Sequence, residues 1–226
     1  MIRIAVTKIS CLLGQHPYKS SADTLKEIKF LHQTKRKVPN SSNYKKLEKI
    51  LKACSFYNWF TRARVVTNRM RKIARSIINK VCGEVGIKYN KPYNWFAKER
   101  GVVQEPICIK RIGELYKSKV TDQQKRLRKK YERFEIIGAI DGICQGKVVE
   151  VKCRSCVLKE TPKWELLQLK IYCYILQMPG VLVEFQGSEI KQTEISLEQA
   201  TEEVENLIPE LSQIINDGFF LPNKSE

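Results

Sequence analysis

The fold is decided by residues 134–152, which read Phe-Glu-Ile-Ile-Gly-Ala-Ile-Asp-Gly-Ile-Cys-Gln-Gly-Lys-Val-Val-Glu-Val-Lys. Two short runs rich in β-branched residues, 134–140 and 147–152, flank a turn around Gln145-Gly146. Runs of this length and composition, separated by a glycine turn, are typical of a β-hairpin. We therefore expect the two runs to pair as neighbouring strands at the centre of the domain.

The second run carries charged residues where a buried strand would hold apolar ones. The two-residue period of a strand places Glu150 and Lys152 on one face and Val149 and Val151 on the other. Asp141 ends the first run, so strand pairing brings its carboxylate beside Glu150. Two carboxylates and a strand carbonyl form an all-oxygen pocket of the kind that Mg²⁺ prefers. Lys152 beside this pocket can orient a metal-bound water or neutralise charge on a phosphoryl oxygen.

The residues after the hairpin alternate between helix and strand patterns. Thr161-Pro162 predicts an N-cap and a first-turn proline for a helix to about Gln177. This helix is apolar nearly all round and should be buried. Residues 181–185 predict a third strand, and an acidic helix is expected over 197–216. The order predicts an α/β fold with a central mixed β-sheet flanked by helices.

The residues before the hairpin have mainly helical patterns. Ser20 or Ser21 can cap a helix to about Phe30, and a polar stretch over 35–44 predicts a loop. Further helices are expected from Tyr44, over 59–81, and over 94–116 with interruptions at Gly101 and Pro106. We predict one domain over 1–226, divided into a helical basic part (1–133), a catalytic part (134–186) and an acidic C-terminal helix (187–226).

The charge of the chain is strongly uneven. The 226 residues carry a formal net charge of +17, although residues 184–226 hold ten acids and only two bases. Residues 1–183 therefore hold 39 bases and 14 acids, a local charge of +25. A globular body this basic indicates a polyanionic partner, most commonly nucleic acid. An anionic membrane surface is the alternative, but no strongly amphipathic basic helix stands out.

Composition and the chain start indicate an ordinary intracellular globular protein. Apolar residues make up 42% of the chain and charged residues 29%. No apolar run reaches the roughly 18 residues that a membrane span needs, and the first residues lack a secretory signal pattern. We therefore expect no membrane partner, and we interpret the eight cysteines as reduced thiols.

Asp141 followed by Glu150-Val151-Lys152 resembles the signature of the PD-(D/E)XK nuclease superfamily. Glu105, within the stretch Arg100-Gly-Val-Val-Gln-Glu-Pro106, resembles the helix that supplies a third acid in the lambda-exonuclease/YqaJ branch. Gln168 resembles the glutamine of that branch on the helix after the Glu-x-Lys strand. The pre-proline position of Glu105 departs from the expected helix geometry, because the residue before a proline disfavours the helical region.

The opening of the chain resembles the opening of the same branch. Arg3 is followed seven positions later by Ser10, and then by Gly14 and Pro17-Tyr18. The resemblance implies that Arg3 and Ser10 contact the terminal 5′ phosphate of a DNA end, where a guanidinium fork matches phosphate oxygens.

The resemblance implies a restriction-endonuclease-like core and a Mg²⁺-dependent exonuclease, with Mn²⁺ as a substitute. The enzyme would degrade duplex DNA from a 5′-phosphorylated end, in the 5′ to 3′ direction, for recombination or viral DNA processing. The resemblance also implies a single-strand annealing protein as a partner. The implied roles are metal binding for Asp141, Glu150, the Val151 carbonyl and Glu105, positioning of the attacking water for Lys152, and orientation of Lys152 or DNA for Gln168.

The basic residues of 62–80 and 117–133 are expected to hold backbone phosphates, which predicts a steep loss of affinity with salt. The residues predicted to bind DNA are Arg3, Ser10, Arg62, Arg64, Arg69, Arg75, Lys125 and Arg128.

Other chemistries remain open. Cys153 and Cys156 have the Cys-x₂-Cys spacing of half a zinc or iron–sulfur site, although buried small hydrophobic residues are the simpler interpretation. The two histidines, His16 and His32, are too few and too far apart in the sequence to favour a histidine-based zinc site. An endonuclease with the same site and a non-enzymatic DNA-binding or annealing module are the two alternative functions.

Overall fold

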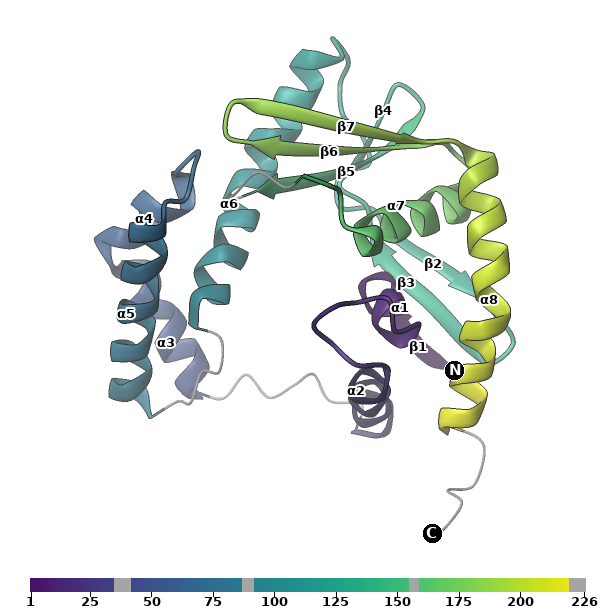
Figure 1. The fold of residues 1–226 in the computed structure, drawn as a ribbon, viewed down its shortest axis with the longest axis horizontal. Helices are drawn as coiled ribbons and strands as arrows, with labels where there is room; N and C mark the ends of the chain where they lie inside the picture. Colours follow the sequence, from purple (N-terminus) through teal and green to yellow (C-terminus); the bar gives the residue numbers. More distant parts are fainter. Residues whose placement is uncertain (35–41, 87–91, 155–158, 220–226) are drawn as a thin grey trace.

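The structure, a computed structural model, describes residues 1–34, 42–86, 92–154 and 159–219. Within these ranges the chain forms seven strands and eight helices, arranged as two sheets with helices against them (Figure 1). The strands are β1 (Ile2–Ala5), β2 (Arg126–Lys130), β3 (Phe134–Ala139), β4 (Gly142–Cys144), β5 (Lys147–Arg154), β6 (Gly180–Gln186) and β7 (Glu189–Ile195). The helices are α1 (Val6–Leu12), α2 (Ser21–Thr34), α3 (Ser42–Ala53), α4 (Ser55–Arg62), α5 (Asn68–Val85), α6 (Pro92–Leu115), α7 (Lys163–Leu176) and α8 (Leu197–Phe219).

Both sheets mix parallel and antiparallel strands. One has the order β1-β3-β2, with β1 parallel and β2 antiparallel to β3. The other has the order β4-β5-β6-β7, in which only the β5–β6 pair is parallel. The predicted α/β class with mixed strands is thus confirmed, but the strands form two sheets where one central sheet was expected.

The predicted hairpin between residues 134–140 and 147–152 is wrong, because these two strands do not pair with each other. The turn at Gln145-Gly146 joins β5 to the short β4, and β3 lies in the other sheet between β1 and β2. Both edges of β3 are therefore already occupied. The chain passes from one sheet to the other at Ile140-Asp141, and a Cβ at Gly142 would lie 2.4 Å from the Val120 side chain. Glycine is required there because the two segments approach so closely.

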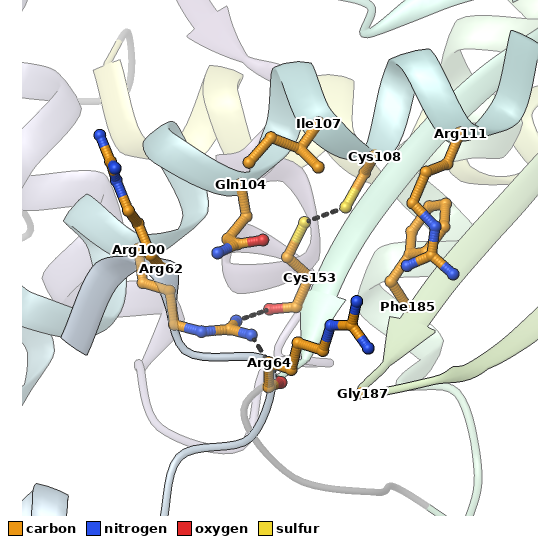
Figure 2. A pocket seen from close by; sticks show the side chains of 10 residues that line it. All are labelled: Arg62, Arg64, Arg100, Gln104, Ile107, Cys108, Arg111, Cys153, Phe185 and Gly187. Carbon is orange, nitrogen blue, oxygen red and sulfur yellow. Dashed lines mark hydrogen bonds between the residues drawn. The ribbon is translucent and has the colours of Figure 1, made fainter. Parts of the chain in front are cut away.

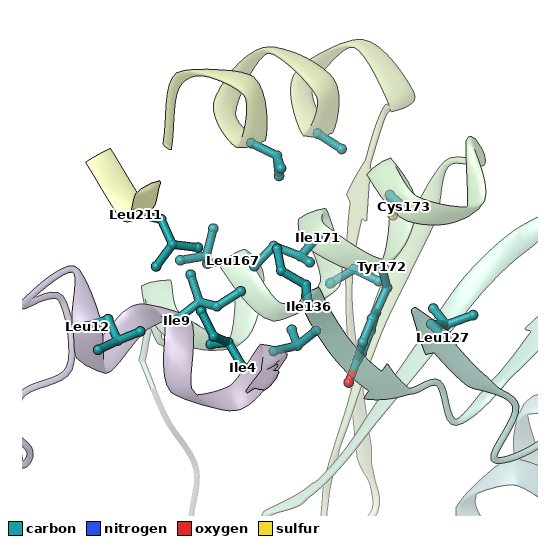
Figure 3. Close-up of a cluster of buried hydrophobic side chains, with 14 of the residues drawn as sticks. Ile4, Ile9, Leu12, Leu127, Ile136, Leu167, Ile171, Tyr172, Cys173 and Leu211 are labelled. Atoms are coloured by element: carbon teal, nitrogen blue, oxygen red, sulfur yellow. The ribbon is translucent and has the colours of Figure 1, made fainter. Parts of the chain in front are cut away.

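Helix α7 fills the main core, as its apolar sequence predicted. Figure 3 shows Leu167, Ile171 and Tyr172 of α7 directed into a cluster with side chains from β1, α1, β3 and α8. Gly138 of β3 leaves room for Tyr172, since a Cβ there would lie 2.7 Å from the tyrosine ring. Thr161 does not cap α7: the N-cap is Pro162, and the Thr161 hydroxyl instead donates to Glu184.

The helical part differs from its prediction at two points. The helix expected over 59–81 is two helices, α4 and α5, and α5 begins where the Thr67 hydroxyl accepts a hydrogen bond from the Met70 amide. The expected interruptions of α6 at Gly101 and Pro106 are absent, because α6 continues through both residues. Pro106 has no amide hydrogen to donate to the carbonyl of Val102, four residues earlier. Val102 is exposed, so water can reach its carbonyl and the helix continues.

Two strands were missed within segments assigned to other structure. The basic stretch 117–133, placed in the mainly helical part, contains β2, and β7 lies between the predicted third strand and the acidic helix. The acidic helix itself is confirmed as α8. The loop predicted over 35–44 falls largely outside the described residues, and the division into three parts stays a prediction.

No helix in the described ranges combines the length and apolar character that crossing a membrane requires.

Candidate active site

The site is built on the open edge of β5. Strand β4 pairs with β5 only as far as Val149, so the next residues of β5 have no strand partner on that side. There the Val151 amide donates to the Asp141 carboxylate over 2.7 Å. Because the amide and carbonyl of one strand residue point to the same side, the Val151 carbonyl faces the same edge as Asp141.

The face of β5 that is directed toward α7 carries a hydrogen-bonded group that is centred on Glu150. Glu150 Oε1 accepts from Lys152 Nζ at 2.6 Å and from Gln168 Nε2 at 2.9 Å. Gln168 also donates to the Tyr172 hydroxyl at 3.3 Å, which fixes its amide orientation. The predicted strand face and the placement of Gln168 beside it are therefore both present in the structure.

Glu150 is a buried carboxylate with one unused oxygen. The residue is only 3% exposed, and Oε2 has no hydrogen-bond partner in the described part of the chain. Burial raises the pKa of Glu150 to about 7, although the Lys152 charge opposes that rise. A buried carboxylate without a full set of donors is costly, so this oxygen is available to a cation.

The neighbouring charges are coupled to Glu150. Burial raises the pKa of Asp141, against the opposing hydrogen bond from Val151. Burial alone would lower the pKa of Lys152, but the Glu150 carboxylate outweighs it and raises that pKa, so Lys152 is held as a cation.

Glu105 approaches the site from α6. Burial and the Asp141 charge raise the pKa of Glu105, whereas the hydrogen bond from Gln124 and the Lys152 charge oppose the rise. Its carboxylate accepts from Gln124 Nε2 at 2.6 Å. The structure thus brings Glu105 close enough to Asp141 and Lys152 for their charges to act on it. Glu105 and Asp141 are 36 positions apart in the sequence.

The donor atoms of this site are oxygens, the kind of ligand that a hard divalent cation prefers. In the described ranges no three His, Cys, Asp or Glu side chains form a metal-binding group by themselves. Mg²⁺ does not need such a group, since it commonly binds through one or two carboxylates and keeps several waters. Asp141, the free oxygen of Glu150 and the Val151 carbonyl supply that kind of donor set.

A second ionic group lies beside the site and was not predicted. Arg154, two residues after Lys152 on the same face of β5, donates to Glu165 of α7 and to Glu184 of β6. Glu184 is fully buried and also accepts from Thr161. Two sequence signals could have indicated this ionic group. Charged residues alternate along one strand at Glu150, Lys152 and Arg154, and Glu184 is an acid within an otherwise apolar strand.

Two of the residues predicted to bind DNA contact one buried acid. Arg3 and Arg128 both pair with Glu135 of β3, at 2.6 and 3.1 Å. Ser10 is buried in α1, and the described contacts do not join it to Arg3. The assignment of Arg3 and Ser10 to a 5′ phosphate therefore stays a prediction without geometric support.

The other predicted DNA contacts are exposed. They comprise Arg69 and Arg75 on α5 and Lys125 before β2. Arg62 and Arg64 lie at and after the end of α4, where they line a pocket between this segment, α6 and the ends of β5 and β6.

Cys153 has a cysteine neighbour from a different element. The Cys153 sulfur lies 3.0 Å from that of Cys108 on α6, and Cys156 lies outside the described residues.

The comparisons give a fold but no family. The sequence matches no protein-family model, and a search of the curated proteins finds no relative. A protein from Eubacterium rectale, named as an exonuclease candidate, aligns over 96% of this chain and 81% of its own, with a TM-score of 0.50 and 9% identity. LHK-Exo in complex with dAMP aligns over 95% and 92%, with a TM-score of 0.43 and 9% identity. SSO0001 aligns over 85% and 100%, with a TM-score of 0.40 and 15% identity.

At these identities the likeness to the Eubacterium rectale protein shows the fold alone, an α/β arrangement of mixed sheets flanked by helices. The expected α/β fold is confirmed, and membership of the PD-(D/E)XK superfamily and of its lambda-exonuclease/YqaJ branch stays a prediction.

Proposed function

We propose that this chain is a metal-dependent deoxyribonuclease. The observation that carries the proposal is the buried Glu150 carboxylate, which has one oxygen held by Lys152 and Gln168 and the other without a partner in the described structure. An ionisable group buried beside a second acid and a lysine indicates a functional site, because such an arrangement costs stability. The fold similarity to the Eubacterium rectale protein, which is named as an exonuclease candidate, supports this proposal.

In the proposed mechanism, Asp141, Glu150 and the Val151 carbonyl would hold Mg²⁺, which Mn²⁺ could replace. The bound ion would supply positive charge to the phosphodiester and acidify water. Gln168 keeps the Glu150 carboxylate in one orientation through its hydrogen bond. Lys152, held as a cation by Glu150, stands where it can orient a water or offset charge that develops on a phosphoryl oxygen.

Glu105 has a separate proposed role. Its raised pKa and its place in the field of Asp141 make it the residue best suited to bind a second ion or to take a proton from a bound water. The hydrogen bond from Gln124 holds the Glu105 carboxylate, which projects from the interior of α6.

The proposed substrate is duplex DNA with a 5′-phosphorylated end, cleaved in the 5′ to 3′ direction. The charge of +25 over residues 1–183 supports a nucleic-acid substrate, and the sequence resemblance supports the direction. A single-strand annealing partner stays a prediction from the same resemblance.

The test uses linear duplex DNA, end-labelled, with and without a 5′ phosphate, in Mg²⁺ and then in EDTA. We expect Mg²⁺-dependent release of nucleotides, faster from the phosphorylated end, and an intact covalently closed circle. Cleavage of the closed circle would indicate an endonuclease. Absence of cleavage on every substrate, with DNA binding retained, would indicate a binding or annealing module and would overturn the proposal.

A variant pair ties the activity to this site. Lys152→Ala should lose cleavage and largely retain DNA binding, because the proposed role of Lys152 is at the reacting phosphate and not in holding the DNA. Lys110→Ala removes the same charge from a side chain that is 81% exposed, and it should cleave like the parent protein. Equal cleavage by both variants would remove Lys152 from the mechanism.

A further inference from the structure

A basic pocket lies on the other face of β5, next to the candidate active site. It occupies about 360 Å³ between α6, the chain that follows α4, and the ends of β5 and β6. Four arginines line it: Arg62 and Arg64, at and after the end of α4, and Arg100 and Arg111 on α6 (Figure 2). The pocket thus lies at the carboxyl ends of two parallel strands, where open α/β sheets commonly bind ligands.

Arg100 builds one wall of this pocket. The residue is 4% exposed, and its guanidinium donates only to backbone carbonyls: those of Ala63, Arg64 and Cys153. These bonds fix the segment after α4 against the end of β5. They satisfy the donors of Arg100 but leave its positive charge without a carboxylate.

Arg64 and Arg111 supply the free cations. Arg111 lies over the Phe185 ring, 4.9 Å from its centre, which orients the guanidinium without neutralising it. Figure 2 shows the Arg100 guanidinium at the Cys153 carbonyl, the Arg64 side chain near the end of β5, and Arg111 beside Phe185. Among the described residues, none of these three arginines forms an ion pair with an acid. Gathered cations without a counter-charge repel one another, so an anion would stabilise the pocket.

We infer that this pocket binds a phosphate group of the nucleic-acid strand that the neighbouring site acts on, an inference that rests on the proposed function. Cys153 in its floor directly follows Lys152, and adjacent strand residues point to opposite faces. A strand that crosses the open edge of β5 would therefore place one phosphate at Lys152 and a nearby phosphate at Arg64 and Arg111. Arginine suits this role because its planar fork matches two phosphate oxygens.

The test measures binding in EDTA, where the proposed cleavage does not occur. The parent protein and the two single variants, Arg64→Ala and Arg111→Ala, are each titrated into a short single-stranded oligonucleotide. The oligonucleotide carries either a 5′ phosphate or a 5′ hydroxyl. Loss of one charge-assisted contact should weaken binding about tenfold and reduce the salt slope by about one. Lys110→Ala, which removes the charge beside Arg111 in the sequence, is the matched control.

Loss of affinity only for the phosphorylated strand would support a terminal phosphate, and an equal loss for both strands would support an internal phosphate. Affinities equal to those of Lys110→Ala would overturn the inference. Arg111→Lys, which keeps the charge and loses the fork, should weaken binding less than Arg111→Ala.

Inorganic phosphate provides a readout that does not need DNA. It should raise the melting temperature of the parent protein more than that of the Arg64→Ala, Arg111→Ala double variant, whose fold is checked by circular dichroism. Equal shifts would count against the pocket. Because neither measurement depends on cleavage, an inactive protein that passes both would refute the proposed nuclease while leaving the phosphate pocket in place.

Discussion

Replacing Glu150 by glutamine should make the metal-free protein more stable at alkaline pH. Glutamine has the shape of the protonated acid and carries no charge, so it avoids the cost of a buried carboxylate. The folded protein raises the pKa of Glu150 from 4.5 to about 7. At about 1.4 kcal/mol per pKa unit, this difference corresponds to about 3 kcal/mol.

The sign of the effect follows from proton binding. The unfolded chain releases the Glu150 proton near pH 4.5, whereas the folded chain holds it until about pH 7. The folded state therefore loses stability relative to the unfolded state as pH rises through this window, and the full loss is present above it. Glu150→Gln should match the parent near pH 4.5 and exceed it by about 3 kcal/mol at pH 8.

Thermal unfolding in EDTA at the two pH values measures this difference. For a chain of this length, 3 kcal/mol corresponds to about 6–12 °C in melting temperature. Glu205→Gln, which removes an exposed charge from α8, should change little at either pH. A Glu150→Gln variant that melts at or below the parent temperature at pH 8 would refute the buried-charge reasoning.

Three further predictions concern neighbouring groups. The apparent affinity for Mg²⁺ should fall as pH drops below about 7, because protonated Glu150 cannot bind the ion; calorimetric titration between pH 6 and 8 tests this, and a constant affinity would contradict it. Arg154→Leu should lower the free energy of unfolding by about 3–5 kcal/mol, since it leaves the Glu184 carboxylate buried without its main cation; urea unfolding that matches the parent would count against that ion pair. Mild oxidation by hydrogen peroxide should join Cys108 and Cys153 as a disulfide, with loss of two hydrogens, because their sulfurs lie 3.0 Å apart. Mass spectrometry detects the disulfide as a linked peptide, and the absence of that peptide would show that the two thiols are not neighbours.

The sequence predicted the parts of the site that depend on local geometry. The period of a strand places Glu150 and Lys152 on one face, and the structure has them there with a 2.6 Å contact. The helix that carries Gln168 and the acidic helix near the C-terminus were also expected close to their observed positions. These elements have strong local patterns, so their neighbours in the chain are enough to define them.

The remaining features depend on contacts between distant segments. The pairing of β3 with β1 joins residues that are more than a hundred positions apart, and no local pattern identifies that partner. For the same reason the hairpin was assigned to the wrong pair of strands. The buried position of Arg100 was also unpredictable, because a lone arginine in a helix is normally exposed and the carbonyls that hold it come from two other segments.

The most direct measurement of the central claim is a titration with Mn²⁺ in which electron paramagnetic resonance measures the free ion. It is carried out on the parent protein and on the Asp141→Asn, Glu150→Gln double variant. Both substitutions keep side-chain size, and the asparagine that replaces Asp141 can still accept the amide hydrogen bond of Val151. We predict that the parent binds Mn²⁺, that Mg²⁺ competes for the same site, and that the double variant loses this binding while remaining folded. Equal Mn²⁺ binding by the two proteins would contradict the claim that these carboxylates form a metal site.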